Sequence, residues 1–131
     1  MTIIKFWSSR NSFRANAATS GLANVVCHDK GEILLKRLRR KHERYSVSVC
    51  FSKRDWNDLP GQAKDAKRFL KTKGRALRQL TRGIVTEDGC LSFPVYSRLS
   101  KKAVVQQDYF DHELLALCAK HGLGINLAIY G

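Results

Sequence analysis

The feature that most constrains the fold is the spacing of apolar and basic residues along KDAKRFLKTKGRALRQLTRG, residues 64–83. On a helical wheel, seven cations fall within about 60° of Lys64, counting Lys64 itself. They are Lys64, Lys67, Arg68, Lys71, Arg75, Arg78 and Arg82. The opposite side carries Ala63, Ala66, Phe69, Leu70, Ala76, Leu77 and Leu80, and only Lys73 interrupts it. Because the phase continues across Gly74, the pattern predicts one amphipathic helix of about 20 residues.

The basic side of this helix departs from an ordinary solvated surface. Helix pairs of opposite charge four residues apart are stabilising, and like pairs each cost a few tenths of a kcal/mol. Here the pairs 64/68, 67/71, 71/75 and 78/82 all have like charge. Four of the seven cations are Arg, whose guanidinium can bind phosphate with two parallel hydrogen bonds. The pattern favours a surface that binds a polyanion over a solvated helix face. A membrane-surface helix is the third alternative. Such a helix needs a free apolar side with large side chains, whereas the apolar side here is rich in alanine.

Charge is concentrated in the middle of the chain. The net charge is +13, and residues 30–82 carry seventeen basic and five acidic side chains, against four and five in residues 83–131. Such an uneven charge distribution indicates which partners the protein binds rather than how it folds. The 131 residues, 44% apolar and 27% charged, fit one globular domain over residues 1–131. No segment matches a secretory signal or a membrane span, so we expect a soluble, cytoplasmic protein with no membrane partner.

A second basic run, KRLRRKHER at residues 36–44, adds Arg37, Arg40, Lys41 and Arg44 as candidate binding residues. Asp29 and Glu32 form a D-x-x-E box before it, which predicts a helix over residues 30–44. The alternative is a hairpin in which DKG joins the strands VVCH and EILL. Two basic helices would flank one groove or form one broad patch, whereas a strand would split the charges between two faces.

Period-two alternation marks the strands. In YSVSVCFS, residues 45–52, Tyr45, Val47, Val49 and Phe51 share one face. TIIKFW and GINLAIY predict a first and a last strand, and KAVVQQ a short one. Asp88-Gly89 predicts a hairpin between IVT and CLSFPV, with Pro94 placing the second strand at an edge.

Two helix signals complete the pattern. Pro60 suits a first helical turn, and Gly83 suits the end of that helix. Asp108 or Asp111 can cap a helix over HELLALCAKH, which Gly122 ends. The sequence therefore predicts an α+β, two-layer domain with a mixed or antiparallel sheet of about five strands packed by about three helices.

Cysteine and acidic residues suggest no strong metal site. Cys27, Cys50, Cys90 and Cys118 form no CxxC pair, so we expect four free, mostly buried thiols. Cys118 and His121 could chelate a metal only if the fold brought Cys27 and His28 close to them. Asp108, Asp111 and Glu113 around His112 could hold Mg²⁺ for a nuclease, but acids at a helix start are ordinary capping chemistry. The sequence predicts no metal and no cofactor.

Two further hypotheses concern RNA. His28 or His42 could act as the general base of a metal-free ribonuclease if the fold placed it beside cations. Stacking of bases would need exposed aromatic side chains, for which the candidates are Phe13, Tyr45, Phe51 and Trp56.

The sequence thus favours a small basic protein that binds the phosphate backbone of RNA or DNA, rather than an enzyme. The alternatives are a phage- or plasmid-type inhibitor of a nucleic-acid-processing protein complex and a small RNase toxin. Nothing in the sequence distinguishes RNA from DNA, or defines sequence specificity or oligomeric state.

Overall fold

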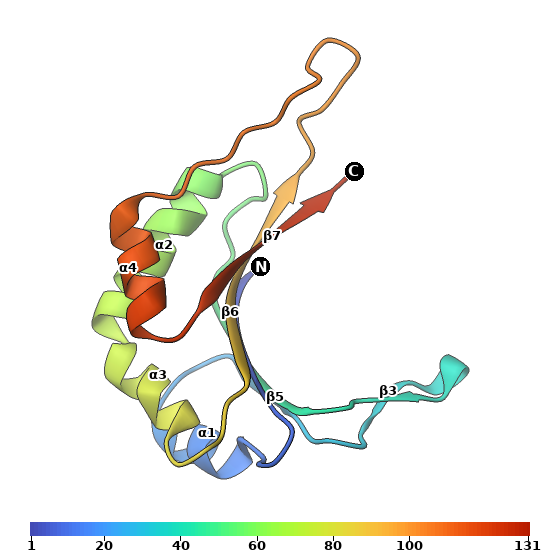
Figure 1. Cartoon of the computed structure of the whole chain (residues 1–131), viewed down its shortest axis with the longest axis vertical. Coiled ribbons are helices and arrows are strands. Elements are labelled where there is room, and N and C mark those ends of the chain that lie inside the picture. Colours follow the sequence, from blue (N-terminus) through green and yellow to red (C-terminus); the bar gives the residue numbers. More distant parts are fainter.

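One mixed sheet of five strands runs through the molecule (Figure 1). In the computed structural model, which describes residues 1–131, the strand order is β2-β5-β1-β6-β7. The strands are β1 (Thr2–Ser8), β2 (Val25–His28), β5 (Tyr45–Ser52), β6 (Asp88–Tyr96) and β7 (Gly124–Tyr130). Only β6 and β7 pair in parallel, and the other neighbours are antiparallel. The prediction of an α+β fold with a five-stranded sheet is confirmed.

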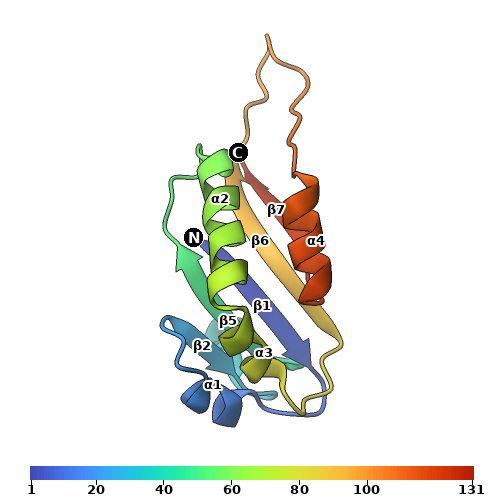
Figure 2. The same ribbon diagram turned by 90° about the vertical axis from the view of Figure 1, so that its left-hand side faces the viewer.

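All the helices lie on one face of this sheet (Figures 1 and 2). They are α1 (Arg14–Ser20), α2 (Leu59–Thr72), α3 (Gly74–Thr81) and α4 (His112–Lys120). There are four rather than about three, because α1 is an additional helix, α2 and α3 are separate, and the expected helix over residues 30–44 is absent. None of them combines the length and the apolarity that crossing a bilayer requires.

Alternation along the strands separates a covered face from an uncovered one. On β5, Val47 and Val49 are buried against the helices, and on β1 so are Ile4 and Phe6. Neighbouring side chains point to the opposite face because successive residues of a strand alternate. The uncovered face therefore carries Ile3, Lys5, Trp7, Val26, His28, Ser46, Ser48, Cys50, Cys90, Ser92, Tyr96, Asn126 and Tyr130.

The predicted single helix over residues 64–82 is wrong in one respect, since the chain bends at Lys73 and continues as α3. Lys73 has φ −112° and ψ 11°, outside helical values, although hydrogen bonds from Lys73 to Phe69 and from Leu77 to Lys73 bridge the bend. A Cβ atom on Gly74 would lie 2.9 Å from Cε1 of His121. The glycine therefore lets the bend approach the end of α4 closely.

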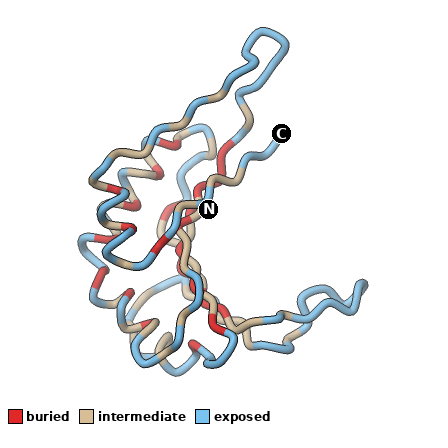
Figure 3. Tube along the Cα trace, in the orientation of Figure 1, coloured by how far each residue is buried: buried red, intermediate tan, exposed pale blue.

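The predicted helix over residues 30–44 is also wrong, because this segment is a hairpin arm. The arm, residues 31–42, contains β3 (Ile33–Leu35), a 3₁₀ turn (Lys36–Leu38) and β4 (Arg40–Lys41). The alternative hairpin also differs, since β2 pairs with β5 and β3 with β4. Figures 1 and 3 show the arm projecting from the sheet on the side away from the helices, and residues 33–41 of it are exposed. A helix here would need a core for its leucines, and none lies within reach.

In the last third of the chain, the predicted hairpin around Asp88-Gly89 does not form. Both residues belong to β6 and pair with β1, and Ile84–Thr86 is not a strand. Pro94 lies in an interior strand rather than an edge strand, but beyond the last residue that β1 pairs. The predicted strand KAVVQQ lies in an irregular loop, residues 97–111. By contrast, the Asp111 cap of α4, its end at Gly122 (φ 67°) and the last strand are as expected.

Candidate nucleic-acid interface

The basic side of α2 and α3 points away from the sheet. The buried residues of the two helices are Leu59, Gln62, Ala66, Leu70, Gly74, Leu77 and Leu80, one continuous helical side. Opposite them, five of the seven cations that the sequence singled out are exposed and form no ion pair. These five, Lys64, Arg68, Arg75, Arg78 and Arg82, are called the helix face below.

The other two cations, Lys67 and Lys71, are paired with carboxylates at the start of α4. Lys67 Nζ donates to Asp111 Oδ2 at 2.7 Å, and Lys71 pairs with Glu113. The hydrogen bond to Asp111 raises the pKa of Lys67, and the hydrogen bond from Lys71 lowers the pKa of Glu113. These two lysines therefore tie α2 to α4 and are less available to a partner than the helix face.

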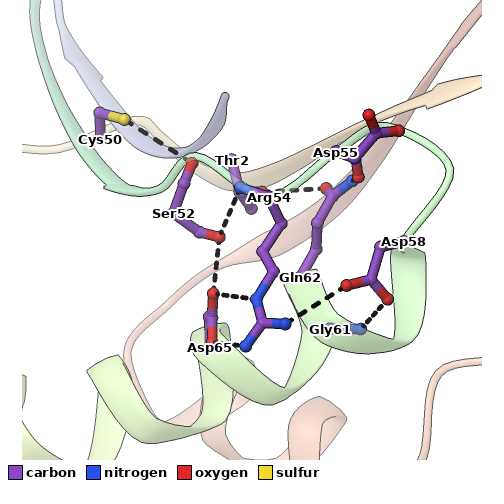
Figure 4. A network of polar contacts seen from close by, with 9 residues as sticks. All are labelled: Thr2, Cys50, Ser52, Arg54, Asp55, Asp58, Gly61, Gln62 and Asp65. Carbon is purple, nitrogen blue, oxygen red and sulfur yellow. Dashed lines mark hydrogen bonds and ion pairs between the residues drawn. The ribbon is translucent and has the colours of Figure 1, made fainter.

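The one acid on the basic segment, Asp65, is neutralised from the side (Figure 4). Arg54 Nε donates to Asp65 Oδ2 at 3.0 Å, and Ser52 Oγ donates to the same oxygen at 2.7 Å. The hydrogen bond from Arg54 is the largest cause that lowers the pKa of Asp65. Arg54 also reaches Asp58, which caps α2 by accepting from Gly61 N at 2.9 Å. The carboxylate therefore does not cancel the field of the helix face.

The carboxyl end of α3 is also fixed. The Asn16 side chain of α1 donates to the carbonyls of Leu80 and Arg82, at 3.0 and 2.9 Å. Gly83, with φ 71°, then turns the chain as predicted. Asn16 thus satisfies carbonyls that the helix leaves free and holds the backbone that carries Arg82.

The arm carries the second group of candidate residues. Arg37 lies in its terminal turn and Arg40 and Lys41 on β4, all exposed and without ion pairs. Arg44, at the root of the arm, donates to Asp88 Oδ2 at 2.9 Å. Because the arm projects on the far side of the sheet from α2 and α3, the two basic regions do not flank one groove or form one patch (Figure 1). That expectation is wrong.

Cations are in excess over the whole surface. Only six of the 24 Lys and Arg residues form ion pairs, namely Arg14, Arg44, Arg54, Lys67, Lys71 and Arg98. Those pairs engage eight of the eleven carboxylates. Of the other eighteen cations, five form the helix face and five lie on the arm.

The candidate metal ligands do not come together. Asp108 pairs with Arg98, and Asp111 and Glu113 pair with the lysines of α2. Cys27 lies on β2 at one edge of the sheet, whereas Cys118 and His121 belong to the α4 region near the other (Figure 2). No cluster of three or more His, Cys, Asp or Glu side chains has metal-binding geometry. All four cysteines are unpaired, but only Cys118 is fully buried.

The two histidines of the ribonuclease hypothesis do meet. The rings of His28 and His42 stack with centroids 4.4 Å apart, and His28 Nδ1 lies 3.4 Å from Glu32 Oε2. General base catalysis by either histidine stays a prediction.

Among the candidate stacking aromatics, Phe13 is buried and Phe51 stacks on Phe69, so both serve the core. Trp56 packs against Tyr96 and Tyr130. The sequence reasoning missed Trp7, which lies on the uncovered face near the arm. The alternation of TIIKFW, which puts Lys5 and Trp7 opposite Ile4 and Phe6, was the available signal.

Comparisons of the chain with protein-family models, curated proteins and solved structures gave no match.

Proposed function

We propose that this protein binds nucleic acid by contacting phosphates with the helix face. The observation that carries the proposal is the lack of ion pairs at Lys64, Arg68, Arg75, Arg78 and Arg82, although carboxylates satisfy the neighbouring cations. Like charges along a helix are destabilising, so their retention is consistent with an anionic partner.

The arrangement suits a duplex backbone. Residues 64–72 of α2 rise about 12 Å and residues 74–81 of α3 rise about 10 Å, so the two helices together span several phosphates of one strand. Four of the five cations are Arg, whose planar guanidinium matches phosphate oxygens. Because phosphates carry no base identity, binding through this face is independent of sequence.

Charge reversal tests the proposal. The triple variant Arg68→Glu, Arg75→Glu, Arg78→Glu should lower affinity for a fluorescein-labelled duplex by about 100-fold or more at about 0.15 M salt. The matched control reverses three exposed, unpaired cations elsewhere, Arg10, Lys101 and Lys102. Circular dichroism should be unchanged in both variants. Equal loss of affinity in both variants would show that net charge alone, and not the helix face, determines binding. No loss in the helix-face variant would refute the proposal.

A second candidate function has one observation in its favour. Four neighbouring apolar side chains on the arm, Ile33, Leu34, Leu35 and Leu38, are 48–61% exposed, and contiguous exposed apolar groups mark interaction sites. An inhibitor that inserts this arm into an acidic protein surface would bury them. Mobility shifts with unrelated DNA and RNA at two salt concentrations separate the candidates. No shift, with co-purification of an acidic protein, would favour the inhibitor.

A further inference from the structure

The root of the arm and the uncovered face of the sheet enclose a groove of about 640 Å³. This volume lies in the range of small-ligand sites. Three cations line the groove, Arg40, Lys41 and Arg44, against one carboxylate, Glu43. The groove therefore favours an anionic occupant.

Its floor contains an unsatisfied hydroxyl group. Ser46 lies directly between Trp7 of β1 and His28 of β2 in the register of the sheet. It is 2% exposed, it lines the groove, and its Oγ has no hydrogen-bond partner. A buried polar group without a partner costs about 1–3 kcal/mol. A ligand atom that hydrogen-bonds to Ser46 Oγ would remove that cost.

Aromatic rings form part of the groove wall. Trp7 and His42 both line it, and His42 is held by its stack on His28. Lys5 Nζ lies 5.2 Å and the Arg44 guanidinium 5.5 Å from the Trp7 ring centroid. The ion pair of Arg44 with Asp88 fixes that guanidinium, whereas Lys5 forms no ion pair. Both cations lie over the indole, so a base that stacks on it takes the place of the unpaired Lys5 ammonium.

We propose that this groove binds a base of single-stranded nucleic acid. The base stacks on Trp7, its polar edge bonds to Ser46 Oγ, and the adjacent phosphates contact Arg40 and Lys41. Stacking platforms beside cations are the usual chemistry of single-strand binding. A duplex cannot use the groove in this way because its bases are stacked on each other.

Other occupants fit the groove less well. A second copy of this chain that docked here through its own arm would bring two arms together. None of the five cations on each arm forms an ion pair, namely Lys36, Arg37, Arg39, Arg40 and Lys41. Like charges repel such a contact. The proposal does not rest on the helix face, which lies on the other side of the sheet (Figure 1).

Tryptophan fluorescence tests the stacking. In a Trp56→Phe background Trp7 is the only tryptophan, so we expect saturable quenching by an eight-nucleotide single strand of DNA or RNA. Trp7→Ala, in the otherwise unaltered chain with a labelled oligonucleotide, should weaken binding at least about fivefold. Heparin supplies negative charge without bases. Equal quenching by heparin or no quenching by the oligonucleotide would overturn the proposal. Quenching that increases with protein concentration in the absence of oligonucleotide would indicate self-association and would also overturn it.

Ser46→Ala separates binding from folding. Removing a hydroxyl that lacks a partner should leave the melting temperature unchanged or higher, yet weaken oligonucleotide binding several-fold. A fall in melting temperature with unchanged affinity would contradict the role of Ser46. In the triple helix-face variant, oligonucleotides should still quench Trp7 while duplex binding is lost. If oligonucleotides do not quench Trp7 in the Trp56→Phe background while duplex binding is normal, base stacking is refuted and the helix-face proposal stands by itself.

Discussion

Replacing Arg75 by alanine tests how the helix face works. Arg75 is exposed, forms no ion pair, and lies one residue after the start of α3. If it contacts one duplex phosphate, its loss should make the slope of log K against log salt shallower by about 0.9. Between about 50 and about 200 mM salt, the variant should then lose about 3.5-fold less affinity than the unaltered protein. The full slope should not be steeper than about −4.5, because the helix face offers five cations.

The assay is fluorescence anisotropy with a labelled duplex at four or more salt concentrations. A matched control is the double variant Lys67→Met, Asp111→Asn, which removes an existing ion pair without changing net charge. Asn retains the capping of α4, so this variant should fold and keep the full slope. An unchanged slope in Arg75→Ala, or an equal change in the control, would refute the reasoning.

Three further predictions concern stability. Burial, with a smaller contribution from Arg78, lowers the pKa of His121, so the unfolded chain binds this proton more readily. Stability should therefore be complete above about pH 6.5 and fall as the pH drops below it, and His121→Gln should weaken this dependence in urea unfolding at several pH values. Gly74→Ala should destabilise the protein because the new Cβ meets the His121 ring. In a His121→Ala background the same change should stabilise the protein by up to about 1 kcal/mol, which thermal unfolding of the double-mutant cycle measures. A reducing agent should leave the melting temperature unchanged because all four cysteines are unpaired, whereas a large drop would indicate a disulfide.

Strong local periodicity made part of the fold predictable. Residues 45–52 form the expected strand, and the residues expected to face the core on α2 and α3 include Ala66, Leu70, Leu77 and Leu80, all buried. Each of these patterns arises because one helix or strand turns one side to the core, and that periodicity is visible in a short stretch of sequence. The bend at Lys73 brings Gly74 close to His121, which is distant in the sequence, and this contact could not be predicted from that window.

The arm could not be predicted for a related reason. Leu34, Leu35 and Leu38 cluster on a helical wheel, but they are exposed on a hairpin whose strands pair with each other. The pattern indicates a helix only where a core can receive its apolar side.

The candidate site was predicted in outline. Of the seven cations singled out in residues 64–82, five are exposed and unpaired on α2, α3 and the residue that follows. That Lys67 and Lys71 are paired depends on Asp111 and Glu113, more than 40 residues away. Trp7 was missed because only the packing of the helices decides which face of the sheet stays uncovered.

Side-chain NMR of the arginines is the most direct test of the central claim, that unpaired cations of the helix face contact phosphates. On addition of a short duplex, the Nε–Hε signals of Arg68, Arg75, Arg78 and Arg82 should shift, and the shifts should reverse as salt is added. The signals of Arg54 and Arg98, which are engaged with Asp65 and Asp108, should stay in place. Shifts confined to the arginines of the arm, or no shifts at all, would contradict the account.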